Sequence, residues 1–215
     1  MTLPIIGMSP GNSDFIDYEV SYLLTAVIRK FGRAVVFIAD TPAISTYLGL
    51  RYSFNRARDK ALSKGRNLKN RVRKIMKQLQ IPKNKVVIIN WDTDVNHLNL
   101  YKEAYNTIAN LYRRNDRFLE DVKSTTLQLL TNTGKLLNSV HESIITATHY
   151  LLSELTFMEV ANNLFKTDRA VYIYHHEWPI YENYIRGVYD DVERKYLGIF
   201  LLPLQSRNTI NERFV

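Results

Sequence analysis

The chain has 215 residues, 46% of them hydrophobic and 12% aromatic, with a net charge of +8 and no cysteine. This composition excludes a disordered chain, a disulfide-stabilised scaffold and a thiolate metal site, and the length predicts one domain over residues 1–215. No uncharged run approaches the roughly 20 residues of a membrane span and no signal peptide is recognisable, so we expect a cytoplasmic protein without membrane association.

Apolar runs rich in valine, isoleucine and aromatic residues alternate along the chain with helical patterns. The predicted strands are Leu3–Ile6, Ala34–Ala39, Lys85–Asn90, Ala170–Tyr174 and Leu197–Leu202. The predicted helices are Asp17–Phe31, Phe54–Gln80, Leu98–Tyr112, Asp116–Leu130, Val140–Leu164 and Pro179–Val188, with a loop at Thr131–Ser139. Such alternation predicts an α/β fold with a mostly parallel sheet of about five strands flanked by helices. Functional residues are then expected at the carboxyl ends of the strands.

The first predicted strand ends in a turn that contains Gly7, Ser9 and Gly11. A serine between a strand and a helix lies where backbone N–H groups and the helix N-terminus stabilise developing negative charge. The Gly-x-Ser-x-Gly spacing also matches the nucleophile elbow of α/β-hydrolases. Ser9 is therefore the leading candidate for a nucleophile, and a turn residue or helix cap is the alternative that so short a motif leaves open.

Two further polar segments follow predicted strands. Asp40-Thr41 follows the second strand, and Tyr174-His175-His176-Glu177 closes the fourth. We expect both segments to face the same crevice as Ser9, and the second carries several groups able to transfer protons. Adjacent strand residues point to opposite sides of a sheet, and no His-Glu-x-x-His spacing is present, so we expect no metal site.

The predicted helix after Arg51 carries all of the excess positive charge. Eleven Lys or Arg and a single acid, Asp59, lie between Arg51 and Lys77, so this window carries +10 and the remaining chain −2. Lys64, Arg71 and Lys74 share one face, and Gly65 is a weak point in the helix. A solvated surface mixes both signs of charge, so we favour a helix that follows a nucleic-acid backbone over a merely solvated face or a membrane-binding helix.

A second pair of functional candidates lies in the predicted helix Val140–Leu164. Tyr150 and Glu154 are four residues apart and therefore share one face, in a segment otherwise rich in leucine and isoleucine. Because glutamate is rarely fully buried, the pattern alone favours a Glu154 at the edge of the surface. A buried Glu154 would need a partner.

Together these residues resemble the cyclodipeptide synthases. The resemblance rests on Gly7-Met8-Ser9-Pro10-Gly11-Asn12-Ser13, on Tyr150-x-x-x-Glu154 and on Tyr174-His175, with the basic helix where the family places its tRNA-binding helix. It implies a Rossmann-like domain similar to the catalytic core of class I tyrosyl- and tryptophanyl-tRNA synthetases. It also implies a monomer that uses no cofactor and condenses the amino acids of two aminoacyl-tRNAs into a 2,5-diketopiperazine.

The resemblance also implies roles for individual residues. Ser9 would accept the first aminoacyl group in a ping-pong scheme that continues through a dipeptidyl intermediate. Tyr150 and Glu154 would hold the α-amino group, and Tyr174 would transfer a proton with His175 beside it. The implied substrate-binding residues are Gly7, Asn12, Ile5, Phe157 and Tyr172. Of these, Ile5, Phe157 and Tyr172 would line the pocket for the side chain of the first amino acid. The implied tRNA-binding residues are Arg56, Lys60, Lys64, Arg66, Lys69, Arg71, Arg73 and Lys74.

Two other functions remain open from the sequence. A serine esterase or acyltransferase would use the same elbow and needs an acid–histidine pair, which the sequence does not place. A non-catalytic RNA-binding module would use the basic helix alone. The aminoacyl-tRNA chemistry is coherent without a nucleotide, because the substrate is already an activated ester and a covalent intermediate divides the reaction into acyl transfers.

Overall fold

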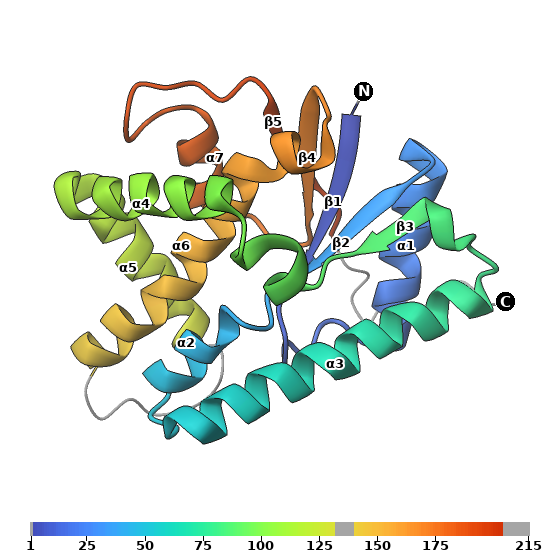
Figure 1. The fold of residues 1–215 in the computed structure, drawn as a ribbon, viewed down its shortest axis with the longest axis horizontal. Helices are drawn as coiled ribbons and strands as arrows, with labels where there is room; N and C mark the ends of the chain where they lie inside the picture. Colours follow the sequence, from blue (N-terminus) through green and yellow to red (C-terminus); the bar gives the residue numbers. More distant parts are fainter. Residues whose placement is uncertain (1, 132–139, 204–215) are drawn as a thin grey trace, which may run out of the picture.

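A computed structural model describes residues 2–131 and 140–203 of the chain. Its centre is one sheet of five strands in the order β3-β2-β1-β4-β5, and every pair of neighbouring strands is parallel. The strands are β1 (Thr2–Met8), β2 (Ala34–Ile38), β3 (Val86–Ile88), β4 (Arg169–Tyr174) and β5 (Leu197–Leu201). The predicted α/β fold with a parallel sheet of five strands is confirmed (Figure 1).

Seven α-helices are present in the described part of the chain, and six of them are the predicted ones. They are α1 (Asp17–Phe31), α2 (Ala43–Gly49), α3 (Phe54–Gln78), α4 (Asn99–Arg114), α5 (Asp116–Thr131), α6 (Val140–Phe165) and α7 (Pro179–Ile185). A short 3-10 turn at Lys83–Lys85 and a π-helical turn at Asp92–Asn96 flank β3. The prediction missed α2, and all but the first residue of the loop predicted at Thr131–Ser139 lies outside the described residues.

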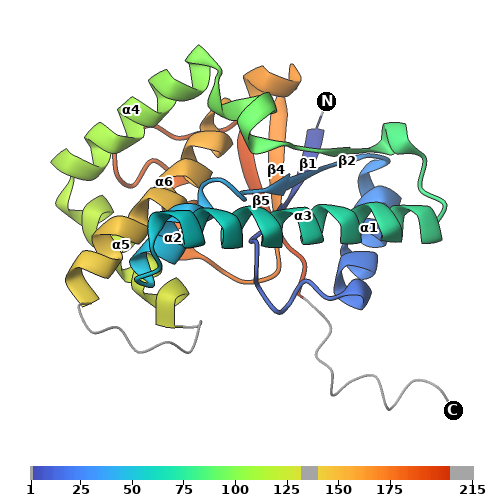
Figure 2. The same ribbon diagram turned by 60° about the horizontal axis from the view of Figure 1, so that its bottom comes forward.

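Helices cover both faces of the sheet, as Figure 2 shows. On one face, side chains of β1, β2 and β4 form a large core with α2, α4, α5, α6 and α7. On the other face, the alternate side chains of the same strands pack against α1 and the second half of α3. Burial on both faces explains why the segments of β1, β2 and β4 are continuous apolar runs rather than alternating ones.

The strand order places a topological switch point at β1. From β1 the chain moves outward to β2 and β3 on one side, and the later strands β4 and β5 extend the sheet on the other. Ser9 follows directly after β1, and Tyr174 is the last residue of β4, which is the direct neighbour of β1. The two candidate residues therefore lie at the carboxyl edge where open parallel sheets bind their ligands.

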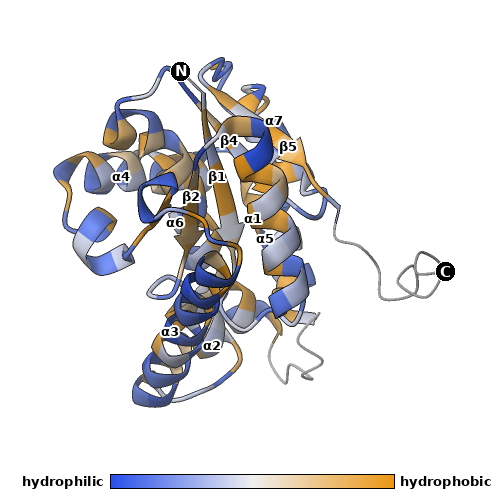
Figure 3. Cartoon of the chain, turned by 90° about the vertical axis from the view of Figure 1, so that its right-hand side faces the viewer, coloured by the Kyte–Doolittle hydropathy of each residue, from blue (hydrophilic) through white to orange (hydrophobic). Residues whose placement is uncertain are grey.

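The basic helix α3 is the longest element between β2 and β3 and lies along the carboxyl side of the sheet (Figure 1). Figure 3 shows α3 as a mostly hydrophilic helix, and its buried positions, such as Leu68 and Ile75, are mainly apolar. Its first half packs through Ala57 and Ala61, and its second half through larger apolar residues such as Val72. Within the described residues, no helix has the length and hydropathy needed to cross a bilayer.

Candidate active site

Ser9 is bound to a buried tyrosine of α6. Its Oγ lies 2.8 Å from the Oη of Tyr150, and that Oη donates a hydrogen bond of 2.8 Å to Oε1 of Glu154. The pair four residues apart on α6 thus forms one chain with the serine after β1, as their shared helix face predicts. Ser9, 141 residues before Tyr150 in the sequence, meets it because β1 and α6 contribute side chains to the same hydrophobic core.

The hydrogen positions in this chain follow from the donor count. A tyrosine hydroxyl has one hydrogen, and Tyr150 donates it to Glu154. Tyr150 therefore accepts from Ser9, so the serine hydroxyl points at the tyrosine oxygen. Burial raises the pKa of Tyr150 well above its usual value, and the neighbouring Glu154 raises it further, so the hydroxyl stays protonated. The result is an ordered path for a proton from Ser9 through Tyr150 to a carboxylate.

Glu154 is buried, with 5% of its surface exposed, so the expectation of a glutamate at the surface edge is wrong. Its partners explain this. Besides Tyr150 at Oε1, the hydroxyl of Tyr181 donates a bond of 2.5 Å to Oε2, and hydrogen-bonded carboxylates tolerate burial. Burial raises the pKa of Glu154, while the hydrogen bonds from Tyr181 and Tyr150 oppose that rise.

Tyr174 completes an aromatic wall beside this carboxylate. Its ring stacks on that of Tyr181, with 4.8 Å between the centroids and 11° between the planes. Burial and the nearby Glu154 raise its pKa, so Tyr174 is a neutral hydroxyl. Gly7 is what lets the ring lie against β1, because a Cβ on Gly7 would be 3.3 Å from Cε1 of Tyr174.

The loop from Ser9 to Ile16 is held by its own polar groups. The Asn12 N–H donates to the Ser9 carbonyl at 3.2 Å, and the Asn12 side chain accepts from the Asp14 N–H at 2.9 Å. Gly11 has a φ of 87°, and a Cβ there would lie 2.7 Å from the hydroxyl of Tyr47. Asn12 therefore shapes the serine loop, and Gly11 permits both its conformation and the close approach of α2.

His175 and His176 follow the end of β4 and face the serine loop. The Nε2 atoms of His175 and His176 lie 3.4 Å and 3.5 Å from Oδ2 of Asp14. The expectation that the two rings point to opposite sides of a strand is wrong, because β4 ends at Tyr174 and the alternation stops there. His175 also packs its ring edge-on against Phe15 at 5.0 Å, beside α1 and away from the Glu154 layer.

Asp40, after β2, is bound to α3. Its Oδ2 accepts a bond of 2.7 Å from Nζ of Lys69, and the same Nζ donates to Asn90 at 3.1 Å. Both charged side chains are less than a tenth exposed. Lys69 is therefore not available to a phosphate, which corrects its place among the predicted tRNA contacts. Gly65 makes this contact possible, since a Cβ on it would lie 2.4 Å from the Cβ of Asp40.

The other predicted tRNA-binding residues lie on the outer side of α3 and differ in their partners. Arg56, Lys64, Arg66, Arg73 and Lys74 are exposed, and Lys60 and Arg71 are partly buried. Lys60 lies over the ring of Tyr52, with Nζ 4.9 Å from the centroid. Arg71 donates to the Phe15 carbonyl, and both Arg71 and Lys74 pair at 2.9 Å with Asp17 of α1. The helix thus contacts the segment that carries Ser9.

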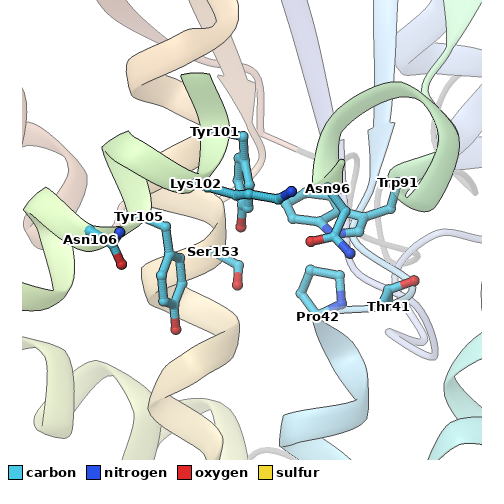
Figure 4. A pocket seen from close by; sticks show the side chains of 9 residues that line it. All are labelled: Thr41, Pro42, Trp91, Asn96, Tyr101, Lys102, Tyr105, Asn106 and Ser153. Carbon is cyan, nitrogen blue, oxygen red and sulfur yellow. The ribbon is translucent and has the colours of Figure 1, made fainter. Parts of the chain in front are cut away.

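The three residues predicted as a side-chain pocket are fully buried in the core. Ile5 and Phe157 are 0% exposed and Tyr172 is 1% exposed, and Phe157 stacks on Phe37 at 4.1 Å. An open cavity of about 310 Å³ lies beside this cluster, and Trp91 belongs to both. Figure 4 shows its lining residues: Thr41, Pro42, Trp91, Asn96, Tyr101, Lys102, Tyr105, Asn106 and Ser153. Ser153 directly precedes Glu154, so this cavity lies beside the part of α6 that carries Tyr150 and Glu154.

The sequence matches a known protein family over most of its length. Residues 4–190 match the family described as cyclodipeptide synthase. The chain belongs to the cyclodipeptide synthase family. It is 23% identical over 212 residues to a cyclo(L-leucyl-L-leucyl) synthase of Staphylococcus haemolyticus (strain JCSC1435), covering 96% of this chain and 89% of that protein.

Solved cyclodipeptide synthases share the fold. One from Staphylococcus haemolyticus superposes with a TM-score of 0.82 at 20% identity, over 95% of this chain and 91% of that one. One from Mycobacterium tuberculosis, described as demonstrating that these enzymes are related to type I tRNA synthetases, gives a TM-score of 0.76 at 17% identity. It covers 95% of this chain and 86% of the other. The expected fold is confirmed, and this Mycobacterium tuberculosis relative links it to the class I tRNA synthetases.

Tyr181 is the residue of this cyclodipeptide synthase site that sequence reasoning missed. It lies in the first turn of α7, 27 residues after Glu154, and no motif marks it. The sequence indicated only that such a partner is needed, because a glutamate on an apolar helix face requires hydrogen-bond donors for both carboxylate oxygens. Tyrosines at the start of a helix that follows a strand end are candidates for that role.

Proposed function

We propose that this enzyme forms a cyclic dipeptide from two aminoacyl-tRNAs through an aminoacyl ester on Ser9. The observation that carries the proposal is the chain from Ser9 Oγ through Tyr150 to the buried carboxylate of Glu154. Membership of the cyclodipeptide synthase family supplies the product class. The remaining steps rest on the chemistry of these side chains.

In the first step, Ser9 Oγ attacks the carbonyl carbon of the aminoacyl ester. The bond from that carbon to the terminal ribose oxygen breaks, and the ribose oxygen takes up the proton. A serine ester replaces a ribose ester, so the exchange is close to balanced and needs no nucleotide. The orientation of the serine hydroxyl toward Tyr150 supports a role for this tyrosine in guiding the proton.

Glu154 is the group suited to hold the α-ammonium of the bound aminoacyl group. A buried carboxylate attracts a cation strongly because little water screens the interaction. The α-ammonium must lose a proton before the amine attacks the carbonyl carbon of the second aminoacyl ester, and Glu154 can accept that proton. The peptide bond forms, the bond from that carbon to the ribose oxygen of the second tRNA breaks, and the ribose oxygen takes up a proton. The raised pKa of Glu154 favours that role.

Cyclisation follows when the free amine of the dipeptidyl ester attacks the carbonyl carbon attached to Ser9. The amide bond forms, the bond to Oγ breaks, and the serine regains its proton. Tyr174 is suited to the proton transfer in this step, because it lies against Gly7 of β1 and stacks on Tyr181 beside Glu154. We assign His175 a positioning role through its contact with Asp14 of the serine loop.

The exposed cations of α3 are proposed to bind the phosphates of the tRNA. Lys64 lies next to Gly11, two residues beyond Ser9, since a Cβ on Gly11 would be 3.8 Å from Cγ of Lys64. A nucleic-acid backbone following α3 therefore passes the serine loop. The adjoining cavity lined by Trp91 and Tyr105 is suited to an apolar part of the substrate.

A serine esterase is less well supported. Asp14 and His175 do form an acid–histidine pair, but His175 turns its Nε2 toward the acid. In the serine–histidine–aspartate arrangement, Nε2 faces the serine and Nδ1 the acid. Ser9 here bonds to a tyrosine.

The serine ester is tested by intact-protein mass spectrometry after acid quenching with an aminoacyl-tRNA. The wild-type protein is expected to gain one aminoacyl group and Ser9→Ala none, with a loss of cyclic dipeptide of at least about a thousandfold. Ser13→Ala, an exposed serine of the same loop, is the matched control and keeps both signals. Continued product formation by Ser9→Ala would refute the nucleophile. The product itself is identified by mass spectrometry of the medium of expressing bacteria.

The tRNA interface is tested by charge reversal. Arg66→Glu with Arg73→Glu is expected to weaken tRNA binding and to reduce the slope of log K against log salt by about one per lost phosphate contact. The matched control is Arg113→Glu with Arg114→Glu, two exposed arginines at the end of α4. Equal effects of the two double variants would mean that only net charge matters and would contradict the proposed interface.

A further inference from the structure

Three groups able to bind a metal ion meet between the serine loop and the end of β4. Asp14, His175 and His176 each offer one ligand atom, and these three atoms all lie within 4.8 Å of one another. Asp14 comes from the loop after Ser9, and the histidines follow Tyr174. None of these three atoms contacts the reacting groups in the proposed acyl transfer, where His175 has only a positioning role through Asp14.

The spacing of the atoms fits a tetrahedral ion. Zinc binds histidine nitrogen and carboxylate oxygen at about 2.0 to 2.1 Å, so two ligands of a tetrahedron are about 3.3 to 3.4 Å apart. The two distances to the Asp14 oxygen are 3.4 Å from His175 and 3.5 Å from His176. These two distances are longer than a good hydrogen bond and close to a ligand–ligand edge, and the third separation is within 4.8 Å.

His175 supplies an independent sign of a missing partner. Its side chain is only 9% exposed, and its Nε2 is buried without a hydrogen-bond partner. Buried polar atoms are almost always satisfied, so an orphan nitrogen aimed at a carboxylate oxygen and a second imidazole requires an explanation. Burial, together with His176, lowers the pKa of His175, which favours the neutral imidazole that binds metals.

The other two side chains leave the cluster open to solvent. Asp14 is 41% exposed and His176 is 60% exposed, so an ion can enter from that side and keep water in its fourth position. Two imidazoles and one carboxylate are the ligand types that suit zinc and similar divalent transition metals, whereas magnesium and calcium prefer oxygen ligands.

We propose that Asp14, His175 and His176 form a binding site for one divalent transition-metal ion, with zinc as the ion that best fits the ligand set. The bound ion would join the loop that carries Ser9 to the segment that follows Tyr174. It fixes the position of that loop relative to β4. This site stands or falls independently of the proposed aminoacyl transfer, because its test measures binding and not catalysis.

The test is a calorimetric titration of tag-free, chelator-treated protein with zinc chloride. One saturable site is expected, and His176→Ala and Asp14→Asn should each weaken it at least about tenfold. His97→Ala, which removes an exposed histidine elsewhere, is the matched control and should bind as the wild type does. At a hundredfold excess of zinc over Kd, the melting temperature should rise by roughly 5 to 10 °C in the wild type and the control.

Cobalt provides a second readout of the same site. A four-coordinate cobalt ion absorbs visible light far more strongly than an octahedral one, so the wild type should show that absorption and His176→Ala should lose it. Magnesium chloride should produce no heat and no thermal shift. Absence of a saturable zinc site, or equal zinc affinity in His176→Ala and the wild type, would overturn the proposal. Circular dichroism of His176→Ala should show the same spectrum as the wild type, because His176 is exposed.

Discussion

Tyr150→Phe removes the one hydroxyl that joins Ser9 to Glu154, and its effects follow from the two bonds lost. The bond to Glu154 is charge-assisted and buried, so its loss costs about 2 kcal/mol of unfolding free energy. For a chain of this size that is a fall in melting temperature of about 4 to 8 °C. Ser9 also loses the acceptor that orients its hydroxyl.

The expected loss of activity is larger than the loss of stability. A positioned proton-transfer group contributes about a hundredfold or more to rate, so formation of the aminoacyl-enzyme should slow by at least about a hundredfold in Tyr150→Phe. Rapid-quench measurement of the covalent ester reports this first transfer separately from cyclisation. The tRNA affinity should not change, because the proposed tRNA contacts lie on α3 and not at Tyr150.

Tyr181→Phe is the matched control for this experiment. It removes a bond of the same kind from the other oxygen of Glu154, so a similar fall in melting temperature is expected. Because Tyr181 bonds Glu154 and not Ser9, the first transfer should be retained and later steps impaired. If both variants form the aminoacyl-enzyme at the same rate, the path from Ser9 through Tyr150 is not used.

Three further outcomes concern stability. Lys69→Met leaves the carboxylate of Asp40 buried without its cation and should cost about 3 to 5 kcal/mol in urea unfolding, whereas adding Asp40→Asn should recover part of that cost. Gly65→Ala should destabilise the protein although alanine is the better helix former, because its Cβ would clash with Asp40; a raised melting temperature would contradict the packing. Because the pKa of His175 is lowered in the folded protein, the unfolded chain binds more protons below about pH 6.5. The free energy of unfolding should therefore fall as the pH drops through that region. His175→Gln should flatten this dependence of unfolding free energy on pH, measured in the presence of a chelator.

The secondary structure was predictable where the pattern was strong. The bounds of α1 are the predicted Asp17–Phe31, since the apolar period runs to the turn at Gly32, which has a φ of 75°. The strands β1, β2 and β4 are predictable because both of their faces are buried. The helix α2 was missed because its seven residues include weak helix formers such as Thr46.

The site was predictable only as far as single residues carry chemistry. Tyr150 and Glu154 share a helix face by their spacing, and Ser9 meets them as expected. The burial of Glu154 and the part played by Tyr181 depend on contacts between distant elements, which no local pattern records. Lys69 could not be told from its neighbours, because its burial follows from Asp40 on another element.

The position of α3 between the two cores has a mechanical consequence. Its first half is fixed to α2, and its second half to α1 and, through Arg71, to the carbonyl of Phe15. A force applied to α3 is therefore transmitted to both α1 and α2. A tilt of α3 would displace both α2 and the part of the Ser9–Ile16 loop that contains Phe15. If α3 binds RNA as we propose, the bound RNA would thereby also influence the position of the Ser9 hydroxyl.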